Sequence, residues 1–257
     1  MAKMELAFDV LGETHKKPLI ILHGFFASSR NWRACAEVLS ENYCVYVLNA
    51  RNHGTSPHHP RMDYPSMAAD VRDFIVRHKL SKAVIIGHSM GGKTAMWLAL
   101  HYPQLISHLI VVDIAPIAYQ HSFEPLIRAL KSLPLDTLRN RKEAEVWLAP
   151  AIPELSYRQF LLQNLQLLEG RYQWRIDLDI FQASGQAIIG FPAVASSTFF
   201  EGMALFIAGA QSNYVTPSTL HPLFPQANFD VIANAGHWVH VQQPNAFIQA
   251  INTFLTR

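Results

Sequence analysis

A glycine–serine turn at residues 87–91 sets the strongest limit on the possible folds of this chain. The β-branched apolar run of residues 84–86 leads into the pattern Gly-x-Ser-x-Gly, with Ser89 at its centre, and helix-forming residues follow. This order predicts a strand, a sharp turn and a helix. Gly87 and Gly91 lack a Cβ, so the strand and the helix can approach the serine backbone closely. The motif fits either a passive structural serine or a nucleophile at a helix start, where free N–H groups face negative charge.

Strand-like and helix-like segments alternate along most of the chain. The segment at residues 65–78 places its apolar residues on one helical face, and residues 245–255 form a closing amphipathic helix. This alternation predicts a mostly parallel sheet with helices on both faces, and catalytic groups at the carboxyl ends of the strands. The expected strands lie at residues 6–10, 18–22, 43–48, 84–86, 106–114, 204–209 and 228–232.

The alternation stops between residues 117 and 199. Helical patterns dominate this part of the chain, and residues 170–174 are expected to cross between them. We therefore predict an inserted helical cap at 117–199 and a core formed by residues 1–116 and 200–257. The expected cap helices lie at residues 124–131, 141–148, 157–168 and 176–188.

Composition excludes several classes of protein. With 257 residues, of which 50% are hydrophobic, the chain can bury a large core. The 21 basic and 19 acidic residues are spread along the chain and give a formal charge of +2. This balance lacks the basic patch that binding to nucleic acid requires. Residues 1–6 carry an early acidic residue and no apolar signal core, and no apolar run is long enough to span a bilayer. These features predict a soluble cytoplasmic protein without stable membrane insertion.

The cysteines and the histidine-rich loop do not indicate a metal site. Cys35 and Cys44 lie in apolar segments and are expected to be buried free thiols. His53, His58 and His59 share a proline-containing loop that lacks a convincing set of further ligands. We expect no structural or catalytic metal.

A catalytic serine needs a base within hydrogen-bond reach and an acid that orients the base. His237 follows the last expected strand, and Asp113 lies at the end of the strand after the serine helix. The order Ser89, Asp113, His237 is the serine, acid, histidine order associated with this turn. We therefore predict these residues as the catalytic triad.

Five segments of the chain form a recognisable set. They are His-Gly-Phe-Phe at 23–26, Arg-Asn-His-Gly-Thr-Ser at 51–56, Gly-His-Ser-Met-Gly-Gly-Lys at 87–93, Val-Asp-Ile-Ala-Pro at 112–116 and Asn-Ala-Gly-His-Trp at 234–238. Together they resemble the α/β-hydrolase family, and within it the small bacterial esterases and acyl-CoA thioesterases related to mammalian abhydrolase domain-containing protein 11. The resemblance implies an α/β-hydrolase fold, no cofactor, and an oxyanion hole formed by the backbone N–H groups of Phe25 and Met90.

The chain departs from the broader family in one turn. Many members carry the acid in a Gly-x-x-Asp turn after the penultimate strand, but residues 209–213 read Gly-Ala-Gln-Ser-Asn and hold no carboxylate. The resemblance therefore favours the other known placement, Asp113. The alternatives are a turn-capping role for Asp113 and rival acids at Asp177 and Asp179. His23 and His88 are expected to support the loops around the site.

The predicted substrate is a small ester or acyl-CoA. Phe25, Phe26, Trp238 and apolar cap residues are expected to line an acyl pocket. Arg128 and Lys131 either receive an anionic substrate group or form a solvated helix face.

The predicted activity is that of a serine hydrolase that cleaves carboxylic esters or acyl thioesters. Two alternatives remain open: a carbon–carbon bond hydrolase with the same triad, and a binder of small hydrophobic ligands without turnover. A dehalogenase is disfavoured because that chemistry uses a carboxylate at the nucleophile turn.

Overall fold

The computed structural model describes residues 4–220 and 222–256. Residues 1–3, 221 and 257, which fall within the predicted core ranges, lie outside the described residues. Within the described ranges, seven strands form one sheet of order β1-β3-β2-β4-β5-β8-β9. In this sheet β1 (Phe8–Leu11) pairs antiparallel with β3 (Tyr43–Leu48), and the other described pairs are parallel. Besides β3, the parallel strands are β2 (Lys17–Leu22), β4 (Ala83–His88), β5 (Ile106–Val112), β8 (Met203–Gly209) and β9 (Asn228–Ile232).

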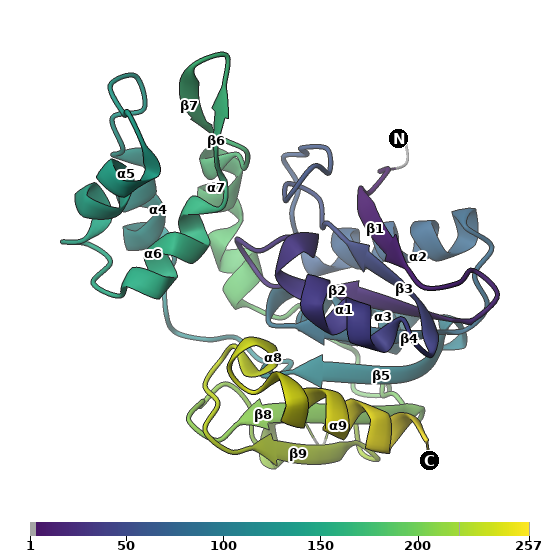
Figure 1. Cartoon of the computed structure of the whole chain (residues 1–257). Helices are drawn as coiled ribbons and strands as arrows, with labels where there is room; N and C mark the ends of the chain where they lie inside the picture. The colour runs from purple at the N-terminus through teal and green to yellow at the C-terminus, as the bar shows by residue number, and fades with distance from the viewer. Residues whose placement is uncertain (1–3, 221, 257) are drawn as a thin grey trace.

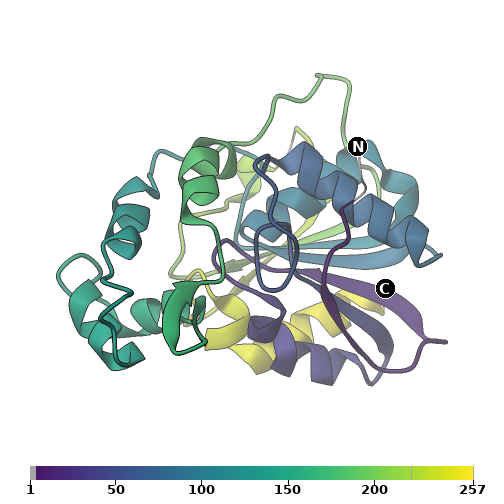
Figure 2. The ribbon, with the colours of Figure 1, turned by 90° about the horizontal axis from the view of Figure 1, so that it is seen from above.

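Helices cover both faces of the sheet. Figures 1 and 2 place α1 (Arg33–Leu39) and α9 (Pro244–Leu255) on one face, and α2 (Tyr64–Arg77) and α3 (Met90–His101) on the other. Each face has its own apolar cluster, with Trp32 and Phe247 in one and Phe74 and Met96 in the other. This burial on both sides explains why the central strands are apolar runs without alternation. None of the helices in the described ranges is long and apolar enough to cross a membrane.

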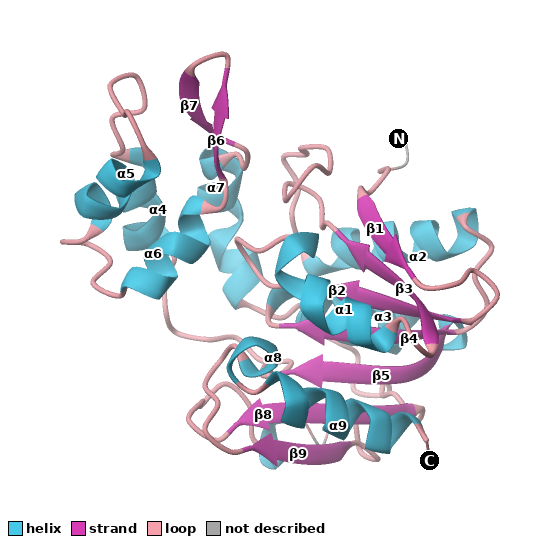
Figure 3. Cartoon of the chain, viewed as in Figure 1, coloured by secondary structure: helices cyan, strands magenta, loops and turns pink. Residues whose placement is uncertain are grey.

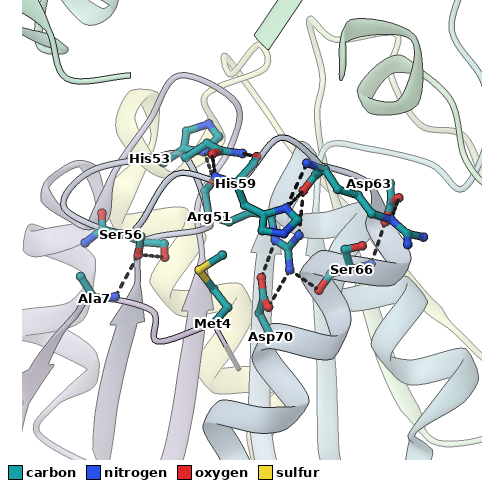
Figure 4. A network of polar contacts seen from close by, with 12 residues as sticks. Met4, Ala7, Arg51, His53, Ser56, His59, Asp63, Ser66 and Asp70 are labelled. Atoms are coloured by element: carbon teal, nitrogen blue, oxygen red, sulfur yellow. Dashed lines mark hydrogen bonds and ion pairs between the residues drawn. The ribbon is translucent and has the colours of Figure 1, made fainter. Parts of the chain in front are cut away.

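A buried ion pair fixes the loop between β3 and α2. The Arg51 Nε lies 2.7 Å from Asp70 Oδ2, and its Nη2 lies 2.7 Å from Asp70 Oδ1. A third contact joins Arg51 Nη1 to the Arg61 carbonyl oxygen at 2.7 Å. Figure 4 shows this guanidinium between α2 and the loop. Planar, two-pronged pairing of this kind fixes orientation as well as distance. The loop is therefore held firmly beside the carboxyl end of β3.

The segment between β5 and β8 contains four helices and a β-hairpin among its described residues. In Figure 1 it lies beyond the end of the sheet toward which the arrowheads of β5, β8 and β9 point, and Figure 3 shows its mixed helix and strand content. The helices pack on a cluster of apolar side chains that also includes Phe25, Phe26 and Met90 of the core. The elements are α4 (Glu124–Lys131), α5 (Arg141–Leu148), α6 (Leu155–Leu162), β6 (Leu165–Leu168), β7 (Arg171–Trp174) and α7 (Leu178–Ile189).

The prediction of a helix at 157–168 is wrong in its second half. The helix ends at Leu162, and Leu165–Leu168 instead pairs antiparallel with Arg171–Trp174. Glu169 and Gly170 both have positive φ, at 50° and 79°, which is the backbone of a tight two-residue hairpin turn. Residues 170–174, expected to cross between cap elements, therefore belong to this hairpin.

Candidate active site

The turn after β4 holds Ser89 in a strained backbone conformation. Ser89 has φ 53° and ψ −118°, outside the regions that residues with a Cβ ordinarily occupy. Its neighbours leave no room for larger residues: a Cβ on Gly87 would lie 2.3 Å from the Gly91 carbonyl oxygen, and one on Gly91 would lie 2.2 Å from the Leu22 carbonyl oxygen. The Gly-x-Ser-x-Gly pattern is thus required by close packing of β2, β4 and α3. Ser89 faces the cavity described below.

Asp113 and His237, predicted from chain order alone, meet in the structure. Asp113 follows β5, and His237 lies in the loop after β9. The His237 Nδ1 lies 2.8 Å from Asp113 Oδ2. Because the carboxylate is an acceptor, Nδ1 carries the proton and donates it, which leaves Nε2 of the neutral ring free to accept one. This is the arrangement that a general base requires.

The Asp113 carboxylate is fully buried and has further donors that sequence reasoning missed. The Ser212 hydroxyl donates to Oδ2 at 2.5 Å, and the Gly209 N–H donates to Oδ1 at 3.1 Å. Both donors come from the turn after β8, where the broader family carries its acid. The fourth position of that turn, Gly-x-x-Ser here, was the available signal. Hydrogen bonds to the ionised form are what allow a carboxylate to remain charged in a buried position.

The rival acids have other roles. Asp177 caps α7, since its Oδ1 accepts the N–H groups of Asp179 and Ile180 at 2.9 and 3.0 Å. Asp179 forms an ion pair with Lys131 on the cap. Neither lies among the residues that line the cavity with Ser89. The geometry therefore pairs His237 with Asp113.

His88 and Tyr214 fix the loop that carries His237. The His88 Nε2 donates to the His237 carbonyl oxygen at 2.8 Å. The pKa of His88 is held well below 6.5, mainly by burial and to a smaller extent by the nearby His237 and His240 rings. This ring is therefore neutral. The Tyr214 ring stacks on the His237 imidazole with centroids 4.3 Å apart. His88, which directly precedes Ser89, therefore joins the turn after β4 to the loop that carries His237.

Two histidines hold the loop that contains Phe25. The Ala50 N–H donates to His23 Nε2 at 3.1 Å, so His23 Nδ1 carries the proton and donates to the Gly24 carbonyl oxygen at 2.8 Å. Burial lowers the pKa of His23 to about 4, which keeps the ring neutral. His53 similarly accepts the Phe26 N–H on Nε2 at 3.3 Å. A Cβ on Gly24 would lie 3.4 Å from the Ser89 Cβ, so this loop runs directly beside the serine.

A cavity of about 520 Å³ lies between the core loops and the segment that joins β5 to β8. Its volume lies within the range of small-molecule sites. Phe25, Phe26 and Trp238, all predicted to line an acyl pocket, do line it. Other walls include Ser89, Met90, Tyr157, Phe160, Ile188, Tyr214 and His237.

Arg128 and Lys131 do not face this cavity. Arg128 pairs with Glu124 at 2.6 Å on the same helix, and Lys131 contacts Asp179 and Gln182 at 2.5 Å each. Arg128 and Lys131 therefore belong to a solvated face of α4, and an anion-binding role for these residues is not supported.

A metal site is not found in the part of the chain that the structure describes, since no group of three or more His, Cys, Asp or Glu side chains there could hold an ion. His53 uses its ring nitrogens on the Phe26 N–H and the Arg51 carbonyl oxygen. His58 Nε2 contacts the Arg175 carbonyl oxygen at 3.0 Å. These contacts join loops to one another.

Comparison with known proteins gives consistent matches along the chain. A family model described as alpha/beta hydrolase fold matches residues 17–244. The chain is 39% identical to the sn-1-specific diacylglycerol lipase ABHD11 of Danio rerio, over 98% of this chain and 83% of that protein. It is 33% identical to the esterase YbfF of Escherichia coli, over 94% of each chain. A solved structure of a marine microorganism esterase superimposes with a TM-score of 0.93 at 40% identity, covering 98% of this chain and 99% of that one.

Proposed function

The chain belongs to the α/β-hydrolase fold family, and from this membership we propose that it is a serine hydrolase that cleaves carboxylic esters or acyl thioesters through an acyl-enzyme on Ser89. One observation carries the proposal: the 2.8 Å hydrogen bond between Asp113 and His237 lies at a cavity that Ser89 also lines. Nucleophile, base and orienting acid thus follow β4, β9 and β5, at one end of the sheet.

Each member of the triad has a defined task in acylation. His237 Nε2 takes the hydroxyl proton of Ser89 while the oxygen attacks the substrate carbonyl carbon. The ring becomes an imidazolium, and the Asp113 carboxylate stabilises that charge and holds the ring orientation. His237 then gives the proton to the departing alcohol or thiol, so the acyl group remains on the serine oxygen.

The oxyanion needs donors that exist before the reaction. We assign them to the backbone N–H groups of Phe25 and Met90, because both residues line the cavity beside Ser89. Met90 is the first residue of α3, so its N–H has no acceptor within the helix. Fixed donors of this kind need no reorganisation when the carbonyl oxygen becomes negative.

Deacylation repeats these steps with water. His237 removes a proton from the water that attacks the acyl carbon, and returns it to the Ser89 oxygen as the carboxylic acid leaves. We assign residues 117–199 to the cap that closes the acyl pocket, and residues 1–116 and 200–257 to the core that performs the chemistry. No cofactor enters this scheme.

The cavity supports a small ester as substrate. Its walls combine apolar side chains such as Phe25 and Phe160 with polar groups such as Gln163. Apolar walls hold an acyl chain and exclude water. The relatives named as lipase and esterase favour carboxylic esters over acyl-CoA as the first substrates to test.

The test is a hydrolysis panel of p-nitrophenyl esters and acyl-CoAs of increasing chain length, with wild type and Ser89→Ala side by side. We expect wild type to hydrolyse a subset and Ser89→Ala to lose about 10,000-fold or more in kcat. Equal rates in the two proteins would overturn the assignment of Ser89. A wild type that is inert on the whole panel yet still reacts with a fluorophosphonate at Ser89 would reject ester and thioester cleavage and favour the carbon–carbon alternative.

A further inference from the structure

Lys93 is a buried lysine with no part in the reaction steps above. It lies one helical turn after Ser89, and its backbone N–H donates to the Ser89 carbonyl oxygen at 3.0 Å. The residue is 1% exposed and lines the same cavity as Ser89. A buried ammonium is costly unless it is fully hydrogen-bonded, so its partners indicate what it does.

The Lys93 ammonium binds both connections between the core and the cap. We define the entry connection as residues 113–123, between β5 and α4, and the exit connection as residues 190–202, between α7 and β8. Nζ donates to the Ile117 carbonyl oxygen in the entry connection at 2.8 Å. It also donates to the carbonyl oxygen of Ile189, the last residue of α7, at 2.8 Å and to that of Gly190, the first residue of the exit connection, at 2.6 Å. One side chain from α3 therefore joins both connections to the nucleophile helix.

The surroundings of this ammonium offset part of the cost of burying its charge. The carbonyl groups at the end of α7 form the negative end of the helix dipole. The Nζ also lies 4.6 Å from the centroid of the Tyr119 ring and 5.7 Å from that of Tyr64. The titratable groups that face Lys93 are these two phenols and His121; burial raises the pKa of both phenols, so they are neutral.

The same tyrosines strengthen the junction. The Tyr64 hydroxyl donates to the Ile188 carbonyl oxygen at 2.5 Å, and the Tyr119 N–H donates to the Ile189 carbonyl oxygen at 3.1 Å. The end of α7 is thus held from α2, from α3 and from the entry connection at once. Lys93 is the member of this group that reaches both connections.

We propose that Lys93 is a positioning residue that holds the cap against the nucleophile helix in the arrangement that closes the acyl pocket. The proposal rests on the function proposed above, because it assigns the pocket to the acyl chain. An ammonium has three N–H donors for its three carbonyl partners, whereas a neutral amine has two. Losing the side chain therefore releases part of the junction, while Ser89 and its partners stay in place.

Burial lowers the pKa of Lys93 to about 7, well below the usual value of a lysine. The closed junction therefore holds this proton less tightly than an opened, solvated junction does, so rising pH above about 7 favours the closed arrangement. We expect the two connections to open less often as pH rises, independently of the chemistry at His237.

The test compares Lys93→Met with Lys131→Met, a matched control that removes a lysine from the cap surface. Each variant is assayed with p-nitrophenyl acetate, which is too short to need the cap, and with p-nitrophenyl octanoate.

If the competent cap arrangement falls to about one tenth of the population, KM for octanoate rises about tenfold in Lys93→Met. We expect kcat for acetate to change less than about twofold, Lys131→Met to match wild type, and Lys93→Arg to restore part of the octanoate affinity. An unchanged ratio of the two KM values in Lys93→Met would overturn the proposal.

Amide hydrogen exchange followed by mass spectrometry measures the junction without reference to activity. Lys93→Met should exchange faster in both connections, with the sheet strands unchanged. If Lys93→Met does not fold, wild type at pH 6 and pH 9 replaces it, after correction for intrinsic exchange rates. Slower exchange at pH 9 in both connections relative to β4 and β5 supports the proposal, because opening that releases Lys93 takes up a proton, and equal protection contradicts it. Failure of wild type to react with a fluorophosphonate at Ser89 would reject the hydrolase function instead, while the exchange result still decides the role of Lys93.

Discussion

The end of the sheet that carries Ser89 and Asp113 and the segment proposed as the cap differ in how their residues are held. At the sheet, the site residues themselves form backbone hydrogen bonds with neighbouring strands. The Ser89 N–H donates to the Val112 carbonyl oxygen at 3.2 Å, and the Asp113 N–H donates to the Ile207 carbonyl oxygen at 2.8 Å. The cap meets the core largely through apolar side chains. Its buried polar contacts with the core include the bonds from Lys93 and Tyr64 to the end of α7 and the bond from Asn164 Nδ2 to the Phe26 carbonyl oxygen at 2.8 Å.

We expect this difference to separate two effects of mutation, one on the rate of the reaction and one on the closure of the acyl pocket. Groups fixed by the strands set the geometry of proton transfer, so changes there should lower kcat or unfold the protein. Groups in the cap set the shape of the pocket, so changes there should raise KM first. The four predictions below test that separation in order of decreasing effect.

Asp113→Asn should cause the largest loss. The amide cannot stabilise an imidazolium and favours the wrong tautomer of His237, which in a serine triad costs about 10,000-fold in kcat. KM should change little, because Asp113 lies behind His237. Steady-state kinetics beside Asp9→Asn, an exposed carboxylate on β1, checks this. A variant within tenfold of wild type would place the acid elsewhere.

Asp70→Asn tests the rigidity of the core loop shown in Figure 4. It leaves the buried Arg51 guanidinium without its counter-charge, which should lower the free energy of unfolding by about 3–5 kcal/mol. Urea unfolding measures the change. The control is Glu37→Gln, which breaks the exposed pair with Arg33 and should cost less than about 1 kcal/mol. Similar losses in both variants would remove the distinction.

Buried histidines should make the core sensitive to acid. Burial lowers the pKa of His23 to about 4 and of His240 to about 3, below the unfolded value of 6.5. Their stabilising contribution is complete above pH 6.5 and is lost as pH falls through the folded pKa, because the unfolded chain then binds more protons. The free energy of unfolding should fall by about 1 kcal/mol per pH unit for each such histidine in that window.

Urea unfolding at pH 7, 6 and 5 measures this slope. His240→Phe keeps an aromatic ring stacked on Trp32, 4.1 Å from the present His240 ring, and removes one titrating group. The variant should therefore lose less stability on acidification. A wild type with no slope between pH 7 and 5 would contradict the neutral burial of these rings.

Asn164→Ala should have the smallest effect and should act through the cap. It leaves the buried Phe26 carbonyl oxygen without its donor, at a cost of about 1–3 kcal/mol. We expect a higher KM for octanoate esters with kcat nearly unchanged. Gln186→Ala, at an exposed position on α7, is the control. A fall in kcat with unchanged KM would show that this contact affects the reaction step and not the shape of the pocket.

The core was largely predictable because its signals are local. Buried parallel strands are short apolar runs, and the nucleophile turn has a pattern of glycines that close packing requires. The family resemblance drawn from five segments is confirmed by the match over residues 17–244. Cap helices α4 and α5 also lie at the predicted residues.

Three features could not be obtained from local pattern. The hairpin of β6 and β7 was hidden because Leu165–Leu168 continues the apolar pattern of α6. Ser212 stands at the acid position of a recognisable turn, but its bond to Asp113 depends on β5 and β8 being neighbours in the sheet. Lys93 is buried although lysine is usually exposed, and its three carbonyl partners come from distant parts of the chain.

The most direct test of the central claim is peptide mapping by mass spectrometry after reaction with a fluorophosphonate probe. The account predicts one adduct on Ser89, absent in Ser89→Ala and formed more slowly in Asp113→Asn, whereas Lys131→Met reacts like wild type. An adduct on another residue, or equal labelling of Ser89→Ala, would contradict the assignment of Ser89 as the nucleophile.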